Sequence, residues 1–325
     1  MSLFPHNMRP PKFLAIWVAT ALLFALALLL APGSISGSSL ATTLSFAAVL
    51  AIASIGQTLV VQQGGLDLTV PGVISLAAVI VTKFPNGDDA LLLRWSLIAI
   101  ASGAASGLLC GIAIVNFRIT PLVATLAVNA LLYGVVLYFT RGTSTQAVPQ
   151  SLSDFALTRP LGVPSLAIVA ALAVACVEIG VQGTVWGRRF VAIGASNRAA
   201  RAAAMRVSTY TVATYAVAGV SYAIAGILLA GYLDVPSLMV GKTYLLPTVA
   251  AVVLGGTSLL GGVGSVAATA AGAVFLVQLE QETLGMGAPT SVQGIIEAVI
   301  IAIGMALRLV PWRVVFGQMA PSQTQ

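Results

Sequence analysis

The chain has 325 residues, of which 58% are hydrophobic and 7% are charged, and its formal net charge is +6. A soluble domain carries about 25% charged residues, so the composition excludes a water-exposed globular fold and indicates a multi-pass membrane protein. The positive charge does not indicate nucleic-acid binding, because no basic run is interleaved with aromatic residues. One histidine, His6, and two cysteines in apolar runs, Cys110 and Cys176, leave no residues for a zinc site or a His-based triad.

The first apolar run covers residues 13–31 and follows Arg9 and Lys12. The apolar region of a secretory signal has about 7 to 15 residues, so this longer run is predicted to be an uncleaved transmembrane helix. A spanning helix needs about 20 apolar residues, and the chain offers ten candidates, of which the third and eighth are short. The predicted spans are 13–31, 40–62, 69–83, 92–116, 120–140, 161–182, 208–231, 243–258, 262–282 and 292–309.

The predicted fold class is therefore all-α: a polytopic membrane protein with about ten transmembrane helices and no soluble domain, since neither tails nor loops are long enough to bury a core. Glycine-rich segments interrupt the pattern beside the two short spans, as expected for broken or re-entrant helices. The residues of these two breaks are Gly64, Gly65, Asp67, Gly255, Gly256, Gly261 and Gly262.

Asp67 is one of nine acidic residues and lies at the end of the second predicted span. A carboxylate is costly in lipid, so it needs a specific environment. One interpretation is an anchor of the broken helix that caps free backbone N–H groups. The alternatives are a solvated position at the headgroup boundary and, less favoured, a direct ligand of the transported solute.

The distribution of basic residues predicts the topology. Ten spans place both termini on one side, and the positive-inside rule favours the cytoplasm for that side. Ten basic residues then fall inside and five outside: inside are Arg9, Lys12, Arg118, Arg188, Arg189, Arg198, Arg201, Arg206, Arg308 and Arg313, and outside are Lys83, Arg94, Arg141, Arg159 and Lys242.

The long loop on the predicted cytoplasmic side covers about residues 183–207. Its 197–205 segment is rich in Ala and Arg, both strong helix formers. Ser196 is a candidate N-cap, so a short exposed helix is predicted. Its small alanines and its arginines favour docking to a protein partner, and the alternative is a basic helix resting on anionic headgroups. The candidate docking residues are Gly194, Ser196, Arg198, Ala199, Ala200, Arg201 and Met205.

Polar side chains inside the spans are candidates for a solute pathway. Thr125 and Asn129 share one helix face, as do Gln293 and Glu297 in the last span. Each could instead bond a neighbouring helix. Glu178 is predicted to pair with a loop arginine such as Arg188. The Ser102–Gly107 run of small residues is interpreted as a close helix contact.

Several of these segments resemble the permease subunits of bacterial sugar ABC importers, the ribose-type branch. Gly64-Gly65-Leu66-Asp67-Leu68-Thr69 is similar to their Gly-Gly-Ile-Asp-Leu-Ser signature, and 187–207 is similar to their coupling loop. The 250–258 and 261–265 segments match their late Gly-rich motif, and 119–126 matches a Pro-containing helix start. The resemblance covers roughly residues 40–310.

The chain also departs from the family pattern. Asn197 and Arg198 precede the Ala199-Ala200 pair, where the family usually has an acidic residue, and Ala204 replaces a glycine after that pair. In the fifth span Tyr133 stands where the family often has arginine.

The resemblance implies an assembly in the bacterial inner membrane. Two permease subunits, identical or different, would form the pathway, two ATP-binding subunits would dock on the coupling loops, and a periplasmic binding protein would deliver the solute. This chain has no P-loop, so ATP and Mg would bind the partner and the chain itself needs no cofactor. The chain then divides into a cytoplasmic tail (1–12), a transmembrane permease domain (13–310) and a second cytoplasmic tail (311–325).

Alternative functions remain open from the sequence. The cargo of an ABC importer could be a neutral pentose or hexose, or a branched-chain amino acid, a nucleoside or a furanose-like signal molecule. A secondary transporter with an ion site at Asp67 or Glu297 is a further alternative. A membrane enzyme is disfavoured, because no nucleophile–base set is present.

Overall fold

The computed structural model describes residues 13–143, 146–287, 289, 292, 294–296, 298, 299 and 302. All of the elements in this part of the chain are helices, and no strand occurs among them. The α-helices are α1 (Leu14–Leu30), α2 (Gly37–Gln62), α3 (Val70–Lys83), α4 (Leu92–Asn116), α5 (Pro121–Thr140), α6 (Gln150–Leu157), α7 (Ser165–Gly183), α8 (Val185–Ala195), α9 (Asn197–Ala202), α10 (Val207–Leu233), α11 (Leu245–Leu254) and α12 (Val266–Gly285). Short 3-10 turns are η1 (Pro32–Ile35), η2 (Asp89–Leu91), η3 (Pro160–Gly162) and η4 (Val240–Tyr244).

Five of the described helices are long and apolar enough to cross a membrane: Gly37–Gln62, Asp89–Asn116, Pro121–Thr140, Ser165–Gly183 and Val207–Leu233. The predicted all-α, multi-pass membrane protein is confirmed, and the predicted number of ten spans is not. The two short predicted spans correspond to α3 and α11, which have 14 and 10 residues. Most of the last predicted span, 292–309, lies outside the described residues.

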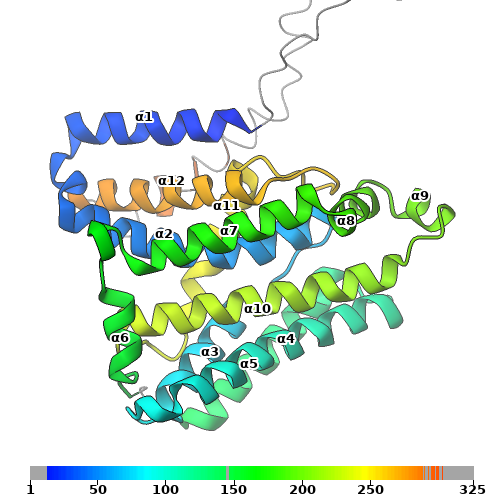
Figure 1. Cartoon of the computed structure of the whole chain (residues 1–325), viewed down its shortest axis with the longest axis horizontal. Helices are drawn as coiled ribbons and strands as arrows, with labels where there is room; N and C mark the ends of the chain where they lie inside the picture. The colour runs from blue at the N-terminus through cyan, green and yellow to red at the C-terminus, as the bar shows by residue number, and fades with distance from the viewer. Residues whose placement is uncertain are drawn as a thin grey trace, which may run out of the picture.

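The long helices lie side by side along one direction, as Figure 1 shows. Helix α2 is central and packs against α7, α10, α11 and α12. It is buried over most of its length, because its many Ala, Ser and Gly side chains allow neighbours to approach on every side. Helices α4, α5 and α7 instead expose large apolar side chains, which suits contact with lipid.

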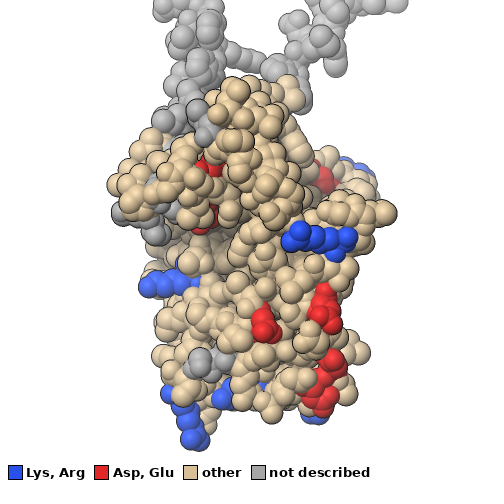
Figure 2. Space-filling view, turned by 90° about the vertical axis from the view of Figure 1, so that its left-hand side faces the viewer, with Lys and Arg blue, Asp and Glu red and all other residues tan. Residues whose placement is uncertain are grey.

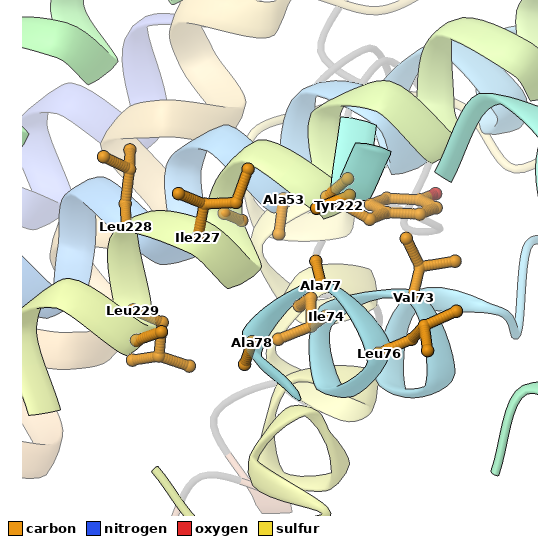
Figure 3. Close-up of a cluster of buried hydrophobic side chains, with 14 of the residues drawn as sticks. Ala53, Val73, Ile74, Leu76, Ala77, Ala78, Tyr222, Ile227, Leu228 and Leu229 are labelled. Carbon is orange, nitrogen blue, oxygen red and sulfur yellow. The ribbon is translucent and has the colours of Figure 1, made fainter. Parts of the chain in front are cut away.

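Helices α4 and α10 make a close backbone contact at their glycines. A Cβ atom added to Gly107 would lie 2.0 Å from the carbonyl oxygen of Tyr215, and one added to Gly219 would lie 2.0 Å from that of Gly103. The small-residue run was interpreted as such a contact, and the structure has it. Figure 3 shows the adjoining core, where Ile74 and Ala77 of α3 face Tyr222 of α10.

The two ends of the bundle differ. Helices α8 and α9 lie at one end, which we call the α9 end, and α6 lies at the other, the α6 end (Figure 1). Figure 2 views the α6 end, where acidic and basic side chains are scattered over the surface. There the carboxylate of Asp89 accepts hydrogen bonds from the backbone and the hydroxyl of Ser151, at 2.9 and 2.6 Å, and so ties η2 to α6.

Candidate functional site

The first glycine-rich break begins where α2 ends. The backbone N–H of Gly64 donates to Val61 at 2.9 Å and that of Gly65 to Val60 at 3.0 Å, which closes the last turn of the helix. Gly64 has φ +75, a left-handed conformation that favours glycine. A Cβ on Gly65 would lie 2.5 Å from the hydroxyl oxygen of Tyr215. Both backbone conformation and packing therefore require glycine in this break.

Asp67 closes the turn that leads into α3. Its Oδ1 accepts hydrogen bonds from the backbone N–H and the hydroxyl of Thr69, at 2.8 and 2.7 Å. The hydroxyl of Tyr222 faces the same carboxyl group and donates to Gln57 at 3.2 Å. The Asp67 side chain has no exposed surface, so it does not lie in water at a headgroup boundary, and its contacts are those of an anchor for the broken helix.

The second break joins α11 to α12 through a tight loop. Gly256, Gly261 and Gly262 have φ values of +97, +88 and +77, which explains why glycine recurs there. The N–H of Ser258 donates to Val263 at 2.8 Å and closes the loop. Helix α12 then begins after Ser265, whose hydroxyl accepts from the N–H of Ala268 at 3.2 Å.

The two breaks and the end of α8 pack against one another. The N–H of Gly262 donates to the carbonyl oxygen of Gln62 at 2.9 Å. A Cβ on Gly194 would lie 2.0 Å from that same oxygen, and one on Gly262 would lie 2.7 Å from the Cα of Ala195. We call this contact of 62–65, 194–195 and 261–264 the glycine junction. A side-chain bond supports it, since the Gln63 amide donates to the Phe190 carbonyl at 2.7 Å.

The predicted loop at about 183–207 contains two helices, α8 and α9, rather than the one predicted. Helix α8 buries Phe190 and Ile193, and Trp186 stacks on Phe190 and on Tyr210. The sequence analysis missed this helix. The spacing of Trp186, Phe190 and Ile193, which places them on one helix face, was the signal that could have found it.

Helix α9 is the exposed helix expected after Ser196, whose hydroxyl accepts from the N–H of Ala199 at 3.2 Å. It ends at Ala202, earlier than predicted, because Ala204 has φ +58 and the N–H of Met205 turns back to Ala200 at 3.0 Å. Ala200 is buried, whereas Arg198, Ala199 and Arg201 are exposed. Met205 packs on the small cluster around Ala200.

Of the four candidate pathway residues, the structure describes Thr125 and Asn129, and each has its own hydrogen-bond partner. The Thr125 hydroxyl donates to Pro121 in its own helix at 2.9 Å, and the amide oxygen of Asn129 accepts from the N–H of Gly72 at 2.8 Å. Asn129 thus binds the first turn of α3. Gln293 and Glu297 lie outside the described residues.

The predicted pairing of Glu178 with Arg188 is wrong. Glu178 instead accepts hydrogen bonds from the backbone of Val266 at 2.6 Å and Ala267 at 3.3 Å, and from the hydroxyl of Ser265 at 2.8 Å. A carboxylate at a helix start is stabilised by the free N–H groups and the helix dipole. This bond is long-range in sequence, which is why local charge spacing did not predict it.

The described part of the chain holds no group of three or more His, Cys, Asp or Glu side chains placed to bind a metal ion. The backbone contacts of the glycine junction instead join a surface helix to two broken membrane helices.

The fold and the junction together define a multi-pass α-helical transport protein with a surface loop packed against its broken helices. The chain belongs to the family described as branched-chain amino acid transport system / permease component, which matches residues 39–307. The family resemblance predicted from the motifs is thereby confirmed. No solved structure matches the chain at a significant level.

Individual relatives extend over most of the chain. The ribose import permease protein RbsC of Escherichia coli strain K12 is 30% identical over 292 residues, 89% of this chain and 91% of that protein. The autoinducer 2 import system permease protein LsrC of Enterobacter sp. strain 638 is 30% identical over 82% of this chain and 78% of its own length. RbsC of Bacillus subtilis strain 168 is 29% identical over 80% of this chain and 81% of its own length. All three relatives are named as import permeases.

Proposed function

We propose that the chain is the translocation subunit of an ATP-driven importer for a neutral, ribose-like sugar. The observation that carries the proposal is the glycine junction, where the end of α8 contacts both broken helices through the Gln62 carbonyl. A partner bound to α9 would move this junction as a unit. The names of the relatives at 30% identity support a sugar as the cargo.

In this proposal the chain binds no cofactor, and ATP and Mg belong to a separate ATP-binding subunit docked on α9. The α9 end is then cytoplasmic, together with both chain termini, and the α6 end receives a periplasmic binding protein. Basic residues on α9 support that orientation through the positive-inside rule. A second permease copy, identical or different, completes the pathway in the inner membrane.

The interior chemistry supports an uncharged cargo. The spans carry hydroxyl and amide side chains such as Thr125, Asn129 and Gln57, and side chains of these types can exchange hydrogen bonds with sugar hydroxyls without a fixed charge. Thr125 and Asn129 remain candidates for that pathway, as do Gln293 and Glu297 in the last predicted span.

The test is uptake of radiolabelled ribose into proteoliposomes that contain the permease, the ATP-binding subunit and the binding protein. Uptake should require ATP and all three components. Uptake that persists without the ATP-binding subunit, driven by a proton or sodium gradient, would show a secondary transporter instead.

A second candidate cargo is the furanose-like signal autoinducer 2, because LsrC relatives share the same level of identity. Competition for uptake of labelled ribose into the same proteoliposomes distinguishes the two cargoes. Unlabelled ribose should abolish uptake of labelled ribose, and an excess of autoinducer 2 should not.

A further inference from the structure

A pocket with a volume of about 420 Å³ lies at the α9 end, beside the glycine junction. Its walls come from four places: the first break at Gly64 and Gly65, the loop between α4 and α5 at Arg118, helix α9 at Asn197 and Arg201, and the first turn of α10 at Ser208. Pockets that bind small molecules have volumes of about 300 to 1,000 Å³. This pocket is therefore large enough for a small metabolite.

The described walls of the pocket carry two exposed basic side chains and no acidic one. Arg118 and Arg201 both line it, and no Asp or Glu is among the described residues that form its walls. No ion pair within the described part of the chain engages either guanidinium group. Two arginines without an acidic partner favour an anion, and the guanidinium group suits the oxygens of a phosphate.

The buried wall of the pocket offers a hydroxyl group that lacks a partner. Tyr215 lines the pocket, its side chain is 2% exposed, and its hydroxyl has no hydrogen-bond partner among the described residues. The Tyr215 hydroxyl lies against Gly65 of the first break, where a Cβ atom on residue 65 would come within 2.5 Å of the hydroxyl oxygen. A buried hydroxyl is normally hydrogen-bonded, and an oxygen of a bound ligand would supply the missing partner.

We propose that this pocket binds a phosphate-bearing anion through Arg118, Arg201 and the hydroxyl of Tyr215. The first turn of α10 at Ser208 adds the positive end of a helix dipole to the same site. The phosphate could belong to a soluble molecule, such as inorganic phosphate or a pentose phosphate, or to an anionic lipid headgroup. Both sources present the same chemistry to the three side chains.

The first arm of the test measures binding of radiolabelled inorganic phosphate, and then of ribose 5-phosphate, to the purified full-length chain in phosphatidylcholine nanodiscs. The second arm measures how much phosphatidylglycerol co-purifies with the chain. The variants are Arg118→Gln, Arg201→Gln and Tyr215→Phe. Arg159→Gln, an exposed arginine at the α6 end, is the matched control, and thermal unfolding verifies that each variant is folded.

In the first arm the chain should bind one phosphate-bearing ligand saturably. Each arginine variant should weaken binding about tenfold or more, because a charge-assisted hydrogen bond is lost. Tyr215→Phe should weaken it by a smaller factor of about two to ten, and Arg159→Gln should leave it unchanged. If the source is a lipid, phosphatidylglycerol should co-purify with the wild type and be lost from a double variant that combines Arg118→Gln and Arg201→Gln.

The proposal is overturned if neither phosphate nor anionic lipid binds, or if both arginine variants bind as the wild type does. A third measurement, co-purification of the ATP-binding subunit, tests for a protein interface: the proposal is overturned if the arginine variants bind phosphate and lipid as the wild type does but lose that subunit. Neither arm measures transport, so failure here is separate from failure of the proposed function.

Discussion

The backbone N–H of Gly262 donates a hydrogen bond of 2.9 Å to the carbonyl oxygen of Gln62 and so joins the second glycine-rich break to the first. Gly194 at the end of α8 packs against the same oxygen. One carbonyl group of the first break therefore contacts two other segments that are far from it in the chain. Because interiors this tightly packed do not deform continuously, a shift of α8 would displace both breaks together.

Gly194→Ala should disrupt this contact. The new Cβ would lie 2.0 Å from the Gln62 carbonyl oxygen and 3.1 Å from the Gly262 nitrogen, and both neighbours are backbone atoms that cannot rotate away. Overpacking of this kind costs about 1–3 kcal/mol. We expect a lower thermal unfolding midpoint in detergent and a strong loss of ATP-dependent uptake.

Gly180→Ala is the matched control for this prediction. Gly180 lies in α7, and nothing stands within 4 Å of a Cβ added there. Alanine favours a helix over glycine by about 1 kcal/mol, so this variant should be as stable as the wild type or more so, with normal uptake. Equal behaviour of the two variants would show that the close approach at Gly194 has no consequence.

Asp67→Ala should destabilise the first break. The substitution removes the acceptor of the Thr69 N–H and hydroxyl in a site without solvent, and a buried unpaired group costs about 1–3 kcal/mol. Asp67→Asn keeps an oxygen at that position and should be milder. Thermal unfolding of both variants measures the difference.

The same pair of variants tests the remaining interpretations of Asp67. An ion site in a secondary transporter needs the negative charge, so Asp67→Asn would abolish uptake as completely as Asp67→Ala. An anchor of the broken helix needs the acceptor, so Asp67→Asn should keep most of its uptake. The capping contact of the wild type supports the second outcome.

Features that depend on local sequence were predictable, and contacts between distant segments were not. The glycines of both breaks and the Ser196 cap follow from backbone preferences of a few adjacent residues. Small residues in the Ser102–Gly107 run indicated close packing without naming α10 as the partner. The contact of Gly194 with the Gln62 carbonyl depends on the packing of α8 against the end of α2, two elements far apart in the chain, and no periodicity carries that information.

Charge spacing gave the wrong partner for Glu178, because a helix end competes with the arginine for the carboxylate. Glu178 lies near Arg188 in the sequence, which suggested an ion pair, but exposed ion pairs contribute only about 0–1 kcal/mol. The N–H groups at the start of α12 offer the carboxylate several fixed donors instead. Only the tertiary fold brings that helix end to α7.

Glu178→Ala should therefore lower stability through loss of the α12 cap. A lost cap costs about 0.5–2 kcal/mol, so a lower unfolding midpoint is expected. Glu178→Gln keeps an acceptor and should be milder. Arg188→Ala should have no effect on the midpoint. If it lowered the midpoint as much as Glu178→Ala does, the result would support an ion pair between Glu178 and Arg188 and contradict the structure.

Ala204→Gly should stabilise the end of the coupling loop. Ala204 has φ +58, and the left-handed conformation costs a residue with a Cβ about 1–2 kcal/mol. Glycine is also the residue that the family pattern described in the sequence analysis implies at this position. We expect a higher unfolding midpoint, whereas Ala203→Gly, outside the left-handed region with φ −82, should not raise it.

Ala199 and Ala200 are adjacent, yet their substitution by leucine should have opposite consequences. Ala200 is 4% exposed and packs with Ile193 and Val207, so Ala200→Leu overpacks this cluster and should lower the unfolding midpoint. Ala199 is exposed, so Ala199→Leu should leave the midpoint unchanged.

The Ala199→Leu variant also tests what α9 binds. If α9 docks to the ATP-binding subunit, the larger side chain at 199 should reduce co-purification of that subunit. If α9 instead rests on anionic headgroups, the added apolar surface should strengthen binding to anionic vesicles and leave co-purification intact.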